Sequence, residues 1–336
     1  MTLITPNTYI SQPRYKDIRS VLIDKCFLKI VNLGENVFEA IVPTSITIMQ
    51  NSEANDFQYI DCTKDASFGG LDKMEATIVN IKNISSNKDL DLISSINLRD
   101  GIVCFDDVLF IRDAGIQYHR SNIGLKNKGG NNLYERIFSD DSERFSVCKP
   151  TWYGKLINRY YINQYTDEYF DLNYKESLNP NETVSFSKES FEKSPKLIWR
   201  QTADRIRATI DCEKRWFRNT IQCAYLRDEY EHKYSYLFLL GLFNSEYIRY
   251  SYNKIVRENG RVFPQVKLTH LKKLPFVLDV NTEIQSKIES LVKTILQKKS
   301  NNECIDTSYE EKEIDKFIYK IYGLTDAEIK IIEQSI

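Results

Sequence analysis

The stretch Lys196-Leu197-Ile198-Trp199-Arg200-Gln201-Thr202-Ala203-Asp204-Arg205 changes from apolar to polar and charged along its length. Its apolar run, bounded by charged residues, predicts a short buried strand over 196–200. Arg200 ends this strand, and Gln201, Arg205 and Arg207 follow it closely. The stretch therefore predicts a piece of sheet core that leads directly into cationic and amide side chains.

The chain around this strand is basic, although 46 Lys and Arg against 47 Asp and Glu give the whole chain a formal charge of −1. Residues 190–275 contain 17 Lys and Arg and 9 Asp and Glu, which gives net +8, whereas residues 1–189 have net −5 and residues 276–336 net −4. Bases alternate with aromatics in this segment. Because Lys and Arg neutralise phosphates and Arg also meets bases, the segment is a candidate nucleic-acid surface. A solvated helix face combined with core aromatics gives the same pattern, so this alternative stays open.

The composition limits the class of protein. With 336 residues, 42% hydrophobic and 28% charged, the chain has enough apolar residues for a sizeable core. Disorder is excluded, because it requires low hydrophobicity together with high net charge. A membrane span is excluded, because no apolar run approaches the required ~18 residues. The seven Cys are widely spaced and predict neither a disulfide scaffold nor a zinc site. The N-terminus lacks a signal-peptide pattern, which favours a cytoplasmic location. We also expect no membrane partner.

No group of residues in the sequence makes a complete active site. The three His are scattered, and the neighbouring carboxylates Asp106-Asp107 and Asp140-Asp141 point to opposite faces if they lie on strands. Glu231-His232-Lys233 and Glu310-Glu311-Lys312 match half of a nuclease signature, but such tripeptides arise freely in a highly charged chain. We therefore expect no catalytic, metal-binding or cofactor-binding residues in this chain.

The order of patterns predicts four parts. Residues 1–65 contain β-rich runs and one helix, residues 66–98 form a polar linker, residues 99–280 mix strands and helices, and residues 281–336 form a helical tail. In the tail, Thr282 and Gln285 predict a capping box at the start of a helix. The apolar stripe of this helix is narrow, so the helix could serve as a spacer, pack into a core, or form a coiled-coil seam with a partner helix.

Several short stretches occur in the order of a known enzyme family. They are Thr2–Tyr9, Tyr15–Arg19, Ile30–Ala40, Pro43–Ile46, Asp100–Val103, Leu109–Ile111, Lys149-Pro150, Tyr153–Tyr160, Lys196–Arg205, Leu242–Ser245, Gly260–Lys267, Leu274-Pro275, Ile314–Lys316 and Tyr322–Thr325. In this order the sequence resembles the C-terminal part of a type IIG restriction-modification enzyme or related adenine-N6 DNA methyltransferase, with its TaqI-like specificity domain. The resemblance implies a mixed α/β fold: the end of a Rossmann-like, parallel methyltransferase sheet with an open edge, then a mixed α/β target-recognition domain, then C-terminal helices.

The sequence departs from this family in its catalytic motifs. Such methyltransferases have a glycine loop for S-adenosylmethionine and an Asn-Pro-Pro-Tyr or Phe motif that holds the flipped adenine. Neither occurs here, and Asn179-Pro180-Asn181 is the nearest approach. The resemblance therefore implies a specificity fragment or split subunit. Its partners would be double-stranded DNA and a methyltransferase or restriction half from another chain, and the intact enzyme would use S-adenosylmethionine, with magnesium for cleavage. Alternatively, the chain is a non-catalytic interaction module or remnant that completes the other half without reading DNA.

The resemblance also indicates which residues contact DNA. Arg200, Gln201, Arg205 and Arg207 are expected near the bases, because Arg can bind guanine and Gln adenine in a bidentate manner. Lys214, Arg215 and Arg218 are expected on phosphates. A second candidate is the polar loop 126–132, whose glycines allow close backbone approach to DNA. Its candidate contacts are Lys126, Lys128 and Asn131, and an ordinary exposed loop is the alternative.

Overall fold

The computed structural model describes residues 1–10, 13–24, 27–34, 37, 42–51, 55–62, 76–81, 101–120, 132–256 and 265–334. The chain divides into two compact units, Met1–Arg99 and Asp100–Ile336. The predicted loop contacts Lys126, Lys128 and Asn131 lie outside the described residues. Strands and helices mix in both units, which confirms the mixed α/β class.

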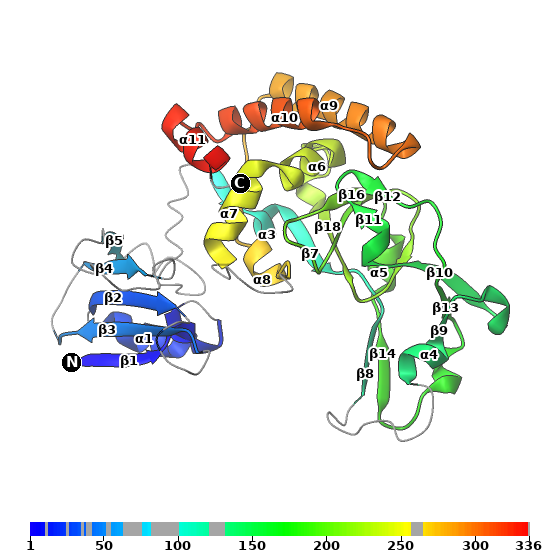
Figure 1. Cartoon of the computed structure of the whole chain (residues 1–336), viewed down its shortest axis with the longest axis horizontal. Helices are drawn as coiled ribbons and strands as arrows, with labels where there is room; N and C mark the ends of the chain where they lie inside the picture. The colour runs from blue at the N-terminus through cyan, green and yellow to red at the C-terminus, as the bar shows by residue number, and fades with distance from the viewer. Residues whose placement is uncertain are drawn as a thin grey trace. The chain divides into compact units, whose positions relative to one another are not determined.

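The first unit contains a five-stranded sheet (Figure 1). Its strands are β1 (Thr2–Pro6), β2 (Phe27–Gly34), β3 (Thr44–Met49), β4 (Asp56–Asp61) and β5 (Thr77–Asn80), in the order β1-β3-β2-β4-β5. Helix α1 (Lys16–Asp24) lies between β1 and β2 in the chain. Ile30 on β2 packs with Phe57 and Tyr59 in one core, whereas Val31 and Leu33 belong to a second core.

The pairing of these strands differs from the expected parallel sheet. Only β2 and β4 are parallel, whereas β1–β3, β2–β3 and β4–β5 are antiparallel. The prediction of a parallel sheet was wrong because residues 35–43 are too few for a crossover, and a short link favours a hairpin. Strand β5 also lies inside the predicted linker 66–98. This strand is only four residues long and contains two apolar residues, Ile78 and Val79, which gives a weak strand signal.

The second unit is built on a four-stranded antiparallel sheet. Its strands are β7 (Leu109–Asp113), β15 (Lys196–Arg200), β16 (Ala208–Asp211) and β18 (Ile221–Leu226), in the order β16-β15-β18-β7. The strand predicted at 196–200 is confirmed, and it is paired on both edges. Leu197 and Trp199 face one core and Ile198 faces another, and all three are fully buried. Burial on both faces explains the uninterrupted apolar run.

Helices cover one face of this sheet (Figure 1). They are α3 (Phe105–Val108), α6 (Tyr236–Asn244), α7 (Glu246–Val256), α8 (Leu268–Leu271), α9 (Thr282–Asn301) and α10 (Ser308–Ile321). Helix α11 (Asp326–Gln334) packs against α7. The apolar stripe of α9, including Ile288 and Val292, packs into the same core as α6. Of the three alternatives for this helix, the structure shows the core. Asn281 caps α9 through its side chain, so the capping box predicted at Thr282 was wrong.

Smaller sheets and an aromatic core lie on the other face. Strands β17 (Trp216–Phe217), β10 (Cys148–Trp152), β13 (Tyr169–Asp171) and β9 (Phe138–Ser139) form a sheet, next to α4 (Leu133–Ile137) and α5 (Lys188–Glu192). Phe170, Phe191 and Trp216 are among its aromatic side chains. Further strand pairs are β8 (Gln117–Arg120) with β14 (Glu182–Ser185), β11 (Ile157–Asn158) with β12 (Tyr161–Ile162), and β6 (Ile102–Cys104) with β19 (Pro275–Val277). No helix in the described part of the chain combines the length and apolar composition of a membrane span.

Candidate functional site

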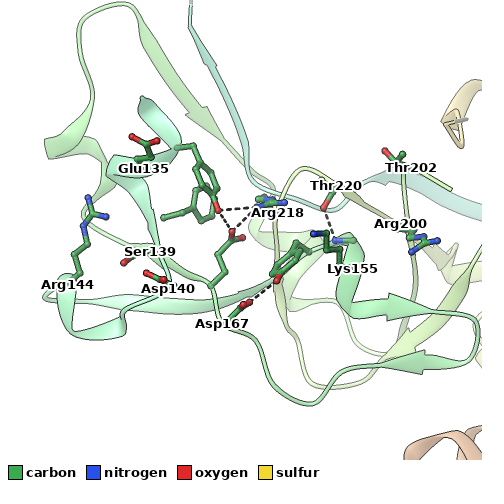
Figure 2. Close-up of a pocket in the computed structure, with 15 residues that line it drawn as sticks. Glu135, Ser139, Asp140, Arg144, Lys155, Asp167, Arg200, Thr202, Arg218 and Thr220 are labelled. Carbon is green, nitrogen blue, oxygen red and sulfur yellow. Dashed lines mark hydrogen bonds and ion pairs between the residues drawn. The ribbon is translucent and has the colours of Figure 1, made fainter. Parts of the chain in front are cut away.

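A cleft of about 720 Å³ opens where the end of β15 meets the small sheet (Figure 2). Arg200 and Thr202 come from the end of β15, Gly154 and Lys155 from the 3-10 helix η5 (Gly154–Leu156), and Tyr134 from α4. Aromatic side chains contribute to the lining together with charged ones. The cations are Arg144, Lys155, Arg200 and Arg218, and the carboxylates are Glu135, Asp140, Asp167 and Glu168.

Arg218 is held in a cluster of polar and aromatic side chains. Its Nη1 donates to Glu168 Oε2 at 2.8 Å and to the Tyr134 hydroxyl at 3.2 Å. The Tyr134 hydroxyl donates to the same carboxylate oxygen. The guanidinium carbon also lies 5.5 Å from the ring centre of Tyr134 and 4.9 Å from that of Tyr153. These contacts fix Arg218 as part of the cleft wall, so its charge is already balanced within the protein.

The backbone of Arg218 is positioned by a close approach that requires glycine. A Cβ atom on Gly115 would lie 2.0 Å from the carbonyl oxygen of Arg218. The neighbouring Ile116 forms a bridge to Arg218, and its amide donates to the carbonyl of Phe217 at 2.8 Å. Gly115 therefore lets the two segments pass at backbone distance.

Burial controls the ionisation of this cluster. It raises the pKa of the Glu168 carboxyl, while hydrogen bonds from Tyr134 and the Arg218 charge oppose the rise. Burial and the neighbouring Glu168 together raise the pKa of Tyr134 to about 12. Tyr134 is therefore a hydrogen-bond donor at neutral pH. The second carboxylate oxygen of Glu168, Oε1, is buried without a hydrogen-bond partner among the described residues.

Arg200 lies apart from this cluster, on the side of Thr202 (Figure 2). Its side chain is partly buried, and its guanidinium has no hydrogen bond or ion pair within the described residues. Nε is shielded from water without a partner. Burial, and next the charge of Arg207, lower the pKa of the guanidinium. The Gly154 amide donates to Thr220 Oγ1 at 3.0 Å, which holds η5 beside Arg200.

The other arginines predicted near bases are engaged within the protein. Arg205 pairs with Glu246 at 2.7 Å and its side chain is 14% exposed. Arg207 donates to Asp204 at 2.9 Å and to Asn158 at 3.1 Å. Gln201 is partly buried, and its backbone amide donates to the Thr220 carbonyl at 2.8 Å.

The residues predicted on phosphates fall into two groups. Lys214 is exposed, with a backbone φ of 55° in the left-handed region. Arg215 is only 6% exposed, donates to Asp211 at 3.1 Å and lies over the ring of Trp152. Arg215, like Arg218, is thus occupied by an internal carboxylate and is not open to a phosphate in this structure. The sequence-based prediction did not consider Asp211, four residues before Arg215, and could not foresee Glu168, which lies 50 residues before Arg218.

Sequence reasoning also missed most of the cleft. Tyr134, Lys155 and Glu168 were not predicted as site residues. Only Lys155 lay in a stretch, Tyr153–Tyr160, that the family resemblance had singled out. Tyr134 and Glu168 line the same cleft as Arg218 but lie 84 and 50 residues before it in the sequence. No local sequence pattern connects the three residues. Within the described residues, no group of three His, Cys, Asp or Glu side chains lies close enough to hold a metal ion.

Comparison with known families gives a direct match. Residues 149–276 match the model of the TaqI-like C-terminal specificity domain. This confirms the resemblance predicted from the sequence, and the matched span contains Lys155, Glu168, Arg200 and Arg218. A search of curated proteins finds no match.

Several solved structures are similar in arrangement at low identity. The type IIG restriction endonuclease BpuSI is 12% identical with a TM-score of 0.36, over 96% of this chain and 47% of that one. The Type IIL restriction-modification enzyme MmeI, in complex with DNA, is 11% identical with a TM-score of 0.49, over 99% and 49%. A type I methyltransferase subunit from Streptococcus thermophilus is 22% identical with a TM-score of 0.23, over 27% and 25%. The chain thus spans about half the length of BpuSI and MmeI.

Proposed function

We propose that this chain recognises a DNA target sequence, as the specificity part of a type IIG or related adenine-N6 DNA methyltransferase whose catalytic half lies outside these 336 residues. The observation that carries the proposal is the match of residues 149–276 to a TaqI-like specificity domain. The cleft supports it, because this span contributes the exposed Lys155 and the guanidinium of Arg200, which has no ion pair within the described residues.

The charges that remain accessible suit a duplex. Arg205, Arg207, Arg215 and Arg218 are paired with carboxylates, so fewer cations reach phosphates than the net +8 of residues 190–275 suggests. Lys155 and Lys214 are exposed. Lysines of this kind neutralise phosphates, whereas groups in a cleft can contact base edges. We therefore expect phosphate contacts to make a modest electrostatic contribution to DNA affinity, and base contacts to add sequence specificity.

We propose that S-adenosylmethionine is bound outside these 336 residues. The cofactor requires a glycine loop in this family, and the sequence contains none. We therefore place S-adenosylmethionine, the adenine-holding motif and any magnesium-dependent cleavage in a catalytic half outside these residues, and we expect the complex to work in the cytoplasm.

A salt titration tests DNA binding. Binding of the full chain to duplex DNA is measured by gel shift from low to high salt, for the wild type and for Lys155→Ala and Lys214→Ala. Each lysine that contacts a phosphate contributes about 0.9 to the slope of log K against log salt, so each variant should reduce the slope by about that amount. The matched controls are Lys287→Ala and Lys316→Ala. These lysines are exposed on α9 and α10 and paired with Glu283 and Glu313, and their removal should leave the slope unchanged.

Absence of binding at low salt contradicts the proposal. Co-purification with a methyltransferase half in that case would favour the interaction module. Unchanged slopes for both Lys155→Ala and Lys214→Ala, with binding retained, would show that DNA uses another surface.

A further inference from the structure

Arg200 differs from the other arginines around β15 because its side chain forms no hydrogen bond or ion pair with any described residue. Four neighbours in the sequence pair with carboxylates: Arg205 at 2.7 Å, Arg207 at 2.9 Å, Arg215 at 3.1 Å and Arg218 at 2.8 Å. No such pair forms at Arg200 within the described part of the chain. Since buried charges are normally paired, a partly buried guanidinium without a partner is suited to receive a ligand.

The position of Arg200 is rigid. It ends β15, a strand hydrogen-bonded to both β16 and β18. The preceding Trp199 is fully buried, and its indole N–H donates to Gln222 at 2.9 Å. The Cβ of Arg200 packs beside Gly154, where an added Cβ atom would lie 3.5 Å from it. A base-reading side chain benefits from this arrangement, because little conformational entropy is lost from its backbone on binding.

The donors of Arg200 that a ligand can reach are its two terminal nitrogens. Nε is shielded from water, whereas Nη1 and Nη2 are neither shielded in this way nor hydrogen-bonded to any described residue. Two donors on one planar group match two acceptors on one ligand. Guanine offers such a pair, N7 and O6, in the major groove, and a phosphate offers two oxygens.

The charge of the cleft favours the base over the phosphate. Its lining carries the carboxylates of Glu135, Asp140, Asp167 and Glu168 against an equal number of cations, so it has no net charge. Such a lining lacks the excess of cations that would draw an anionic phosphate to Arg200. The edge of a guanine carries no net charge and does not need this excess.

We propose that Arg200 reads a guanine in the major groove, so that the DNA target contains a G whose selection depends on this side chain. The inference rests on the proposed function, because it assumes that the cleft faces duplex DNA. It adds the identity of one base and of the residue that selects it.

Selection from a random duplex library tests the inference. The full wild-type chain is expected to enrich a motif that contains at least one fixed G, and Arg200→Gln should lose the preference at that position. A bidentate Arg–guanine pair gives ~5- to 150-fold discrimination. Arg200→Lys should not restore it, because an ammonium lacks the planar fork. The matched control is Arg112→Gln. The Arg112 guanidinium lies 3.3 Å from Glu189 and outside the cleft, so its removal should leave the motif unchanged.

A modified base gives a readout that a structural role for Arg200 would not produce. Replacement of the fixed G by 7-deazaguanine removes the N7 acceptor and should weaken the wild type on the order of tenfold. Arg200→Gln should bind the two duplexes equally. A thermal melt of each variant checks that the fold is intact.

The possible outcomes separate the two proposals. If the wild type enriches no motif, sequence recognition fails, and the reading of guanine fails with it. A motif that persists in Arg200→Gln overturns the role of Arg200 but leaves DNA recognition standing. A uniform loss of affinity for all sequences in Arg200→Gln assigns this side chain to a phosphate and also overturns the inference.

Discussion

The buried ion pair between Lys196 and Asp211 provides a quantitative test of the structure. Both side chains are completely buried, and Lys196 Nζ lies 2.6 Å from Asp211 Oδ2. Nζ also donates to the carbonyls of Phe191 at 3.2 Å and Lys193 at 3.0 Å. Composition counts Lys196 among the bases of a candidate surface, whereas the structure places it inside. Substitution Lys196→Met keeps the length and the apolar stem but removes all three interactions.

The expected loss follows from what remains after the substitution. Removal of one partner from a buried pair costs about 3–5 kcal/mol, because the other charge is left uncompensated. Here Asp211 keeps Arg215, whose Nη1 and backbone amide each lie 3.1 Å from its carboxylate oxygens. We therefore expect a loss near ~3 kcal/mol for Lys196→Met. Asp211→Asn should cost about 5 kcal/mol, because it leaves Lys196 and Arg215 facing a neutral amide.

Denaturant and thermal unfolding of the full chain, followed by circular dichroism, measure these losses. For a unit of this size, 1 kcal/mol shifts Tm by ~2–4 °C, so Lys196→Met should lower the Tm of the second unit by roughly 6–12 °C. The control is Lys287→Met. Lys287 lies 2.5 Å from Glu283 on an exposed helix surface, and its removal should change stability by less than about 0.5 kcal/mol.

A loss below about 1 kcal/mol for Lys196→Met would refute the reasoning, since it would mean that the ammonium group reaches water. The relative size of the two losses in unfolding free energy is a second check. Asp211→Asn should be the more destabilised, and the reverse order would show that Arg215 does not share the carboxylate.

Two further predictions concern the helices. Gly241→Ala should lower the free energy of unfolding by roughly 1 kcal/mol, because a Cβ would lie 2.8 Å from Ile288 Cγ2 and overpacking outweighs the better helix propensity. Urea unfolding measures this change, and a variant more stable than the wild type would contradict the close contact of α6 with α9. Burial raises the pKa of Asp315, which accepts a hydrogen bond from the Glu246 amide, to about 7. The folded state therefore holds this proton more tightly than the unfolded state does. The contribution of Asp315 to the free energy of unfolding is fully present below pH ~4 and is lost as the pH rises through 7. Asp315→Asn should therefore gain up to about 4 kcal/mol over the wild type between pH 4 and pH 8 in urea titrations, and a difference independent of pH would refute this.

Much of the secondary structure could be predicted from local sequence. The apolar run at 196–200 becomes a strand because both of its faces are buried, and the stripe of Ile288 and Val292 becomes a helix that packs against α6. Prediction failed where the local signal was weak. β5 is only four residues long with two apolar residues, and the parallel sheet that the resemblance implied did not take into account the short link 35–43, which favours a hairpin.

The sequence by itself determined that residues 190–275 are basic and that they resemble a specificity domain, because composition and short motifs are properties of neighbours in the chain. It did not determine which of these charges face a ligand. Arg205 meets Glu246 from 41 residues away and Arg218 meets Glu168 from 50, so ion pairing depends on contacts that form only in the folded chain. Tertiary structure thus neutralised most of the predicted arginines and left Arg200, in a cleft, without an ion pair among the residues that the structure describes.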